Sequence, residues 1–143
     1  MAAAEALAGA VRFLTAEQVV RMHDDLLCRF GGLPGGGRRG EGYEGVEAAV
    51  QAVKNSYYDS IAELAAAYAV YIVADGNKRT GAAAMLPFLH ANGFPSGVSA
   101  EDLPYLRIEL QKRSEAGRST DELVRWLASE LRPSRRPSGR KKR

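Results

Sequence analysis

Cysteine is nearly absent from this chain of 143 residues, and Cys28 alone cannot form an intrachain disulfide or a cysteine-based zinc site. Long apolar runs are absent too. The longest uncharged one, Leu64 to Ala74, has 11 residues, whereas a membrane-spanning helix needs about 20. The first ten residues contain Glu5 and none of the lysine or arginine that a secretory signal carries. These absences predict a cytoplasmic protein without a membrane segment.

Sustained alternation of polar and apolar residues is missing as well, so no β-strand is expected and the fold class is predicted to be all-α. Apolar residues instead recur at helical spacing. A Ser or Thr followed three residues later by an acid or amide marks several helix starts. About six helices are expected, over residues 16–30, 43–54, 61–73, 78–91, 99–114 and 120–131.

The helix expected over residues 61–73 is the centre of the predicted bundle. Ile61, Leu64, Tyr68 and Ile72 fall on one face, and the other faces are mostly alanine. A helix that is apolar nearly all round is buried. The sequence therefore predicts a compact helical bundle around this segment.

By composition the chain divides into three parts. Residues 1–12 are predicted to be a flexible start, residues 13–131 the folded domain, and residues 132–143 a disordered tail. Inside the domain, residues 31–42 contain seven glycines and a proline. That composition predicts a mobile loop between the first two helices.

Positive charge is concentrated in the tail. Residues 132–143 hold seven lysines and arginines and no acid, which leaves 13 basic and 17 acidic residues in the rest of the chain. The formal net charge of +3 is therefore a property of the tail, whose Pro, Ser and Gly content argues against packed structure. The tail is predicted either to attract nucleic acid without sequence preference or to act as a solubilising end.

One polar motif separates the two most apolar helices: Asp75-Gly76-Asn77-Lys78-Arg79-Thr80. The free N–H groups at the start of the second helix, the positive end of its dipole and two cations favour an anion. The carboxylate of Asp75 can hold a magnesium ion that bridges phosphate oxygens. The pattern indicates a polyphosphate site, although an Asp-Gly turn that caps a helix beside two solvated cations would look the same.

The motif and its flanks resemble the Fic/Doc (Fido) superfamily: a buried helix, then D-G-N-K-R-T, then a helix that ends in Asn92-Gly93. The Asn-Lys-Arg form is similar to the death-on-curing branch. Two other segments, Phe13 to Leu27 and Val46 to Val50, look like helices that such proteins carry at these places. The resemblance spans about residues 13–94, reaches Leu131 more weakly, and implies a Fido-type helical bundle.

The resemblance also implies an activity. Fic proteins transfer AMP from ATP to a protein hydroxyl, and Doc toxins phosphorylate elongation factor Tu and block translation. ATP as substrate, Mg²⁺ as cofactor, a translation factor as target and an antitoxin protein encoded nearby are therefore expected. Lys78, in place of the glycine that other members have, goes with phosphate rather than AMP transfer.

By position, the resemblance assigns Asp75 to the magnesium ion and the backbone from Gly76 to Arg79 to the phosphates. Asn77 would fix the turn, and Lys78, Arg79 and Thr80 would complete the nucleotide site. Arg79 is also expected to neutralise charge that develops during transfer.

Tyr71 departs from the family pattern, H-x-F-x-D-x-N-K-R, in which the histidine takes the proton from the target hydroxyl. Tyr71 stands at the place of that histidine and Val73 at the place of the phenylalanine. A tyrosine with an ordinary pKa of about 10 is protonated at neutral pH and cannot accept this proton, and the loss of a general base costs about 10²–10⁴-fold. Tyr71 is expected either to keep a chemical role or to be a packing residue.

Two hypotheses for the function follow. The chain is a death-on-curing-like toxin that transfers phosphate or AMP to a translation factor, with activity weakened at Tyr71, or it is an inactive Fido module that binds a nucleotide or a partner protein. Neither His23 nor His90 is an evident replacement for the missing base. His90 follows Lys78 by twelve residues, about 18 Å along a helix.

Overall fold

The computed structural model describes residues 11–22, 41–74 and 78–133, and within them the chain is helical and has no strand. The predicted all-α class is confirmed. A helical segment at residues 16–22 precedes the named elements. These are α3 (Glu41–Lys54), α4 (Ile61–Ala74), α5 (Lys78–Ala91), the 3₁₀ helix η2 (Ala100–Asp102), α6 (Leu103–Glu115) and α7 (Thr120–Leu131).

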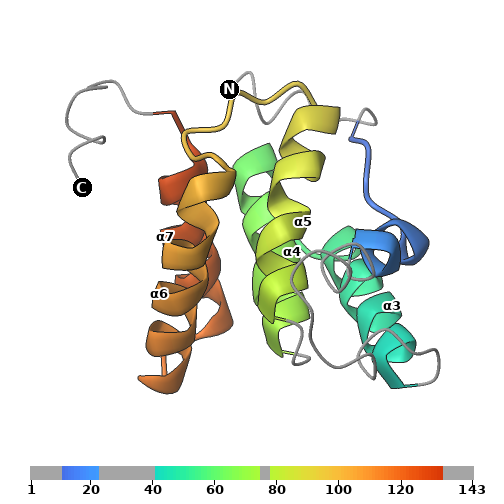
Figure 1. The fold of residues 1–143 in the computed structure, drawn as a ribbon, viewed down its shortest axis with the longest axis horizontal. Coiled ribbons are helices and arrows are strands. Elements are labelled where there is room, and N and C mark those ends of the chain that lie inside the picture. Colours follow the sequence, from blue (N-terminus) through green and yellow to red (C-terminus); the bar gives the residue numbers. More distant parts are fainter. Residues whose placement is uncertain (1–10, 23–40, 75–77, 134–143) are drawn as a thin grey trace.

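Helix α4 is the centre of the bundle. It packs against α5, α7 and α3. In Figure 1, α4 and α5 stand between α6 with α7 on one side and α3 with the N-terminal segment on the other. The side chains of Ala65, Ala66, Ala67 and Tyr68 are fully buried, so α4 contacts protein on every face. The expected central helix is confirmed.

The helix ends follow the capping patterns of the sequence. Thr15 and Gln18 exchange hydrogen bonds between side chain and backbone, of 3.1 and 2.8 Å. Ser119 and Glu122 do the same at the start of α7, at 3.2 and 3.0 Å. Each box satisfies two N–H groups that a helix start leaves free. Gly93, with φ of 67°, ends α5 in the left-handed conformation that glycine adopts readily.

Two helix starts differ from those predicted. Helix α3 begins at Glu41, two residues before the expected start, and includes Gly42. One glycine costs a helix only about 1 kcal/mol, and the buried valines of α3, which pack in the core, stabilise the helix by more than that. The segment after Ser99 begins as the 3₁₀ helix η2, and α6 starts where Pro104 occupies its first turn.

The N-terminal segment is joined to the far end of α5. The side-chain amide of Asn92 accepts a hydrogen bond from the Arg12 N–H at 2.8 Å and donates to the Arg12 carbonyl at 3.1 Å. The Leu14 N–H donates to the hydroxyl of Tyr68 at 2.9 Å, and the Phe13 ring packs 6.3 Å from that of Phe88. Residues 11–15 are therefore part of the folded body.

Within the described residues, no helix combines the length and apolarity that crossing a membrane requires. Residues 23–30 of the first predicted helix, residues 31–40 of the glycine-rich loop and most of the basic tail lie outside the described ranges.

Candidate functional site

The site predicted from the sequence falls at the junction of α4 and α5. Helix α4 ends at Ala74 and α5 begins at Lys78, so three residues connect two helices that pack against each other. Those three, Asp75, Gly76 and Asn77, lie outside the described residues. Lys78, Arg79 and Thr80 form the first turn of α5, but the positions of their side chains are not described either.

The first turn of α5 has the electrostatics of an anion site. Its leading N–H groups have no acceptor within the helix, and they lie at the positive end of the helix dipole. No acidic residue is present in this turn, so the formal charges of Lys78 and Arg79 add to that field. Ala82, Ala84 and Met85 are buried behind the turn, which fixes it on a rigid base. This backbone can hold a phosphate group.

Tyr71 lies one turn before the end of α4. It is half-buried and packs against the core, so its side chain is not fully enclosed. Tyr68, one turn earlier, is fully buried instead and accepts the Leu14 N–H. Burial raises the pKa of Tyr68 to about 12. Of the two tyrosines, Tyr71 is therefore the one with a surface available to a ligand.

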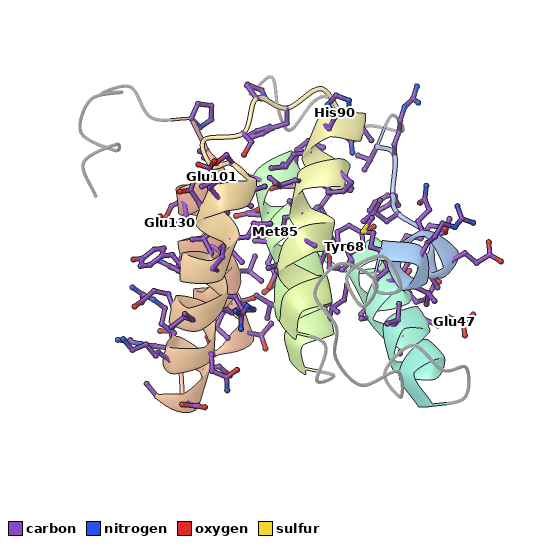
Figure 2. The ribbon with its side chains drawn as sticks, viewed as in Figure 1. Glu47, Tyr68, Met85, His90, Glu101 and Glu130 are labelled. Atoms are coloured by element: carbon purple, nitrogen blue, oxygen red, sulfur yellow. The ribbon has the colours of Figure 1, made fainter. Side chains whose placement is uncertain are left out.

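Among the described residues, no histidine lies at this junction where it could replace the missing base. His90 is exposed in the last turn of α5, at the end opposite Lys78 (Figure 2). That position agrees with the separation of about 18 Å expected from helical rise. His23, the other histidine of the chain, lies outside the described residues.

A cluster that the sequence analysis missed joins the α3–α4 connection to α7. The Tyr58 hydroxyl donates to Asp121 Oδ1 at 2.6 Å, and the Tyr57 hydroxyl donates to the same carboxylate. The two rings lie 4.9 Å apart. Tyr57 is 71% exposed, whereas Tyr58 is only 8% exposed. Asp121 follows Tyr58 by 63 residues, so no local sequence pattern could have revealed the contact.

The pKa shifts of this cluster describe its surroundings. Burial, then the hydrogen bond to Asp121, then the charge of a Tyr71 phenolate raise the pKa of Tyr58. The hydrogen bonds from Tyr57 and Tyr58 lower the pKa of Asp121.

The sequence predicts that the residues at the junction hold a nucleotide and magnesium. In the described ranges, no three His, Cys, Asp or Glu side chains gather closely enough to hold a metal ion. A magnesium ion bound through nucleotide phosphates needs only one or two protein carboxylates and keeps several waters. That requirement agrees with a single predicted ligand, Asp75, beside a helix start that can bind phosphate oxygens.

Comparison with known proteins finds a relative of this chain. The chain is 35% identical over 91 residues to the protein kinase Doc of Escherichia phage P1, a match that covers 58% of this chain and 70% of that protein. No family model matches the chain, and no solved structure does.

Proposed function

The chain belongs to the Doc family, and from that premise we propose that it is a Doc-type toxin that transfers the terminal phosphate of ATP to a hydroxyl of a target protein. The identity to a protein kinase across 70% of that protein's length carries the proposal. The start of α5, with its free N–H groups and two adjacent cations, supports it because phosphoryl transfer depends mainly on positioning and charge neutralisation.

In the proposed site, Asp75 holds the magnesium ion and Gly76 to Arg79 contact the phosphates through the backbone. Magnesium would supply positive charge that offsets the charge of the phosphates when the nucleotide is bound. Asn77 fixes the turn, and Thr80 completes the nucleotide-binding stretch. Lys78 and Arg79 neutralise the negative charge that spreads over the transferred group.

The proposed partners follow from the same premise. The target is a protein of translation, such as elongation factor Tu, and an antitoxin encoded nearby restrains the toxin. Tyr71 at the place of the family histidine weakens the reaction, because a phenol is a much poorer proton acceptor than an imidazole.

The test is a transfer assay with magnesium, a translation extract and ATP labelled at either the γ- or the α-phosphate. Phosphate transfer labels a protein only from γ-labelled ATP, whereas AMP transfer labels it only from α-labelled ATP. Asp75→Ala is expected to abolish the label. Asp59→Ala, the same change at an exposed position in the α3–α4 connection, is the matched control.

Each result has a distinct meaning. Label from γ-labelled ATP that depends on Asp75 supports the kinase. Label from α-labelled ATP corrects the transferred group. No label from either nucleotide, with ATP affinity that falls on changing Lys78, supports the inactive module that binds a nucleotide. No label and no ATP affinity reject the proposed site altogether.

A further inference from the structure

Helix α6 exposes apolar side chains on one face. Among the residues that the structure describes, the large apolar side chains that are more than half exposed are those of Tyr57, Tyr105 and Ile108. Tyr57 packs on the ring of Tyr58, whereas Tyr105 and Ile108 lie three residues apart on α6. This helix stands at the side of the bundle away from α3 (Figure 1). The apolar pair is 55% and 52% exposed there.

Two opposite charges flank this apolar pair. Glu101 precedes Tyr105 by four residues, Lys112 follows Ile108 by four, and both charged side chains are exposed. The helix η2 continues into α6, since Leu103 has a right-handed helical conformation. Positions i, i+4, i+7 and i+11 lie on one face of a helix. The four side chains therefore form one row, the α6 stripe: Glu101, Tyr105, Ile108 and Lys112.

The α6 stripe lies on the side of the helix opposite the core. The buried residues of α6 are Leu106 and Leu110, and through that face α6 packs on α5 and α7. Lys112 forms an ion pair of 3.7 Å with Glu109, but its own side chain is 69% exposed. Glu109 also pairs with Arg113 at 3.3 Å. It therefore keeps a partner when Lys112 turns toward another acid.

The spacing along the α6 stripe is the same in both directions, because four, three and four residues separate its members. Two stripes laid antiparallel place Tyr105 of each copy opposite Ile108 of the other. The same alignment places Glu101 of each copy opposite Lys112 of the other, so both charge pairs attract. A twofold axis generates contacts of this kind, in which residue i meets residue j and j meets i. A parallel alignment sets like charges against each other instead.

We propose that the α6 stripe is the contact surface of a homodimer, in which the α6 helices of two copies pack antiparallel about a twofold axis between residues 106 and 107. The partner is a second copy because the charges that complement the stripe, in reverse order around two apolar side chains, are those that the stripe itself carries. The contact is independent of the proposed function. Since the stripe faces away from α5, pairing leaves the candidate sites of both copies uncovered.

A contact of this size forms a weak dimer. Stable complexes bury about 1,200–2,000 Å² of surface, and one helix face from each copy supplies less. We expect a dissociation constant of about 10⁻⁴ M at low salt. Added salt should weaken the association, because it screens the two exposed charge pairs.

The test is sedimentation velocity of the full chain at low salt, at concentrations from about 10 μM to about 1 mM, which bracket that constant. Ile108→Lys places a charge at the centre of the stripe and is expected to weaken association at least about 10-fold. Because Ile108 is exposed, the monomer should keep its fold, and circular dichroism checks that it does.

Charge reversal tests the alignment. Lys112→Glu and Glu101→Lys each set like charges against each other in the dimer, and each is expected to weaken association about 10-fold. Lys54→Glu makes the same change at an exposed lysine in the last turn of α3 and is expected to alter association by less than about twofold. An equimolar mixture of the Lys112→Glu and Glu101→Lys chains restores opposite charges at both pairs. It should associate within about threefold of the wild type.

The outcomes separate the alternatives. A wild-type chain that stays monomeric at the highest concentration overturns the proposal and leaves the stripe to a partner of another kind. Association that Ile108→Lys does not weaken places the contact on another surface, and a mixture that does not associate excludes the antiparallel alignment. Either result also overturns the proposal. None of these measurements uses a nucleotide, so a failure of the proposed function would leave them unchanged.

Discussion

At the scale of single residues, Tyr71 is expected to limit the rate of the proposed transfer. The family histidine would take up a proton that a phenol at this position does not. We expect Tyr71→His to raise the transfer rate by about 10²–10⁴-fold if the rest of the pocket is intact. Tyr105→His, which makes the same change at an exposed position of α6, is the control. An unchanged rate in the Tyr71→His variant would mean that more than the base separates this chain from active relatives.

The burial and the hydrogen bond of the Tyr68 hydroxyl can be read only from the structure. Its hydroxyl is buried and accepts the Leu14 N–H at 2.9 Å. Tyr68→Phe leaves that N–H without its partner, so we expect a loss of about 1–3 kcal/mol in the free energy of unfolding at neutral pH. Urea titration measures this loss, and Tyr105→Phe, at an exposed site, is expected to be neutral.

The pH dependence of stability follows from the same residue. Burial raises the pKa of Tyr68 from an ordinary value of 10.0 to about 12, so the folded chain holds the phenolic proton more tightly than the unfolded chain. The resulting stability is complete below pH 10 and is lost as the pH rises from about 10 to about 12. Denaturation curves across that range should fall more steeply for the wild type than for Tyr68→Phe. Parallel curves would contradict the assignment.

At the scale of elements, periodicity and caps predicted most of what the structure shows. The bounds of α5 and α7 agree with the expected ones, because an Asn-Gly end and a capping box are local signals. The predicted start of α3 was wrong by two residues, since the glycines that predicted a loop do not prevent a helix whose valines pack in the core. The split of the predicted fifth helix into η2 and α6 was also missed, because the capping pattern at Ser99 says nothing about which kind of helix follows.

Gly97 lies in a backbone contact between elements that no sequence pattern predicts. Its N–H donates to the Leu131 carbonyl at 2.7 Å, and a Cβ atom there would lie 2.3 Å from the Arg132 carbonyl oxygen. We expect Gly97→Ala to cost about 1–3 kcal/mol of folding free energy, because neither backbone can move apart without losing the hydrogen bond. Thermal unfolding measures the cost.

Gly93 is the matched comparison. Its φ is 67°, and no atom lies within 4 Å of an added Cβ. A side chain there is therefore disfavoured by the backbone conformation and not by a steric clash. Gly93→Ala is expected to cost about 1 kcal/mol, and Gly93→Asn less, because asparagine tolerates the left-handed region. At position 97, by contrast, the asparagine variant should be no more stable than the alanine variant. A more stable asparagine variant would show that the close approach to Arg132 is not what requires glycine.

At the scale of the whole molecule, sequence and tertiary structure contribute to the candidate site in different ways. Residues 75–80 are contiguous, so the pattern alone nominated them, and the described ends of α4 and α5 agree with a turn at that point. Tyr58 and Asp121 come together only because α7 packs on α4. Contacts of that kind depend on the packing of whole helices, which a single sequence does not encode in any local pattern.

The division of charge between body and tail gives the last prediction. Arg132 donates its N–H to the Ala128 carbonyl and its guanidinium to Ser60, so a chain that ends at Pro133 keeps the contacts of α7. Removing residues 134–143 takes away six cations and leaves 14 basic and 17 acidic residues. If the tail attracts nucleic acid, the full chain should bind DNA and the shortened chain should not. A plot of the logarithm of the binding constant against the logarithm of the salt concentration should then have a negative slope no steeper than about −5. Salt-dependent fluorescence anisotropy with duplex DNA measures both.

Binding that survives the truncation would place the contact on the helical body, whereas a full chain that does not bind at low salt would leave the tail as a solubilising end.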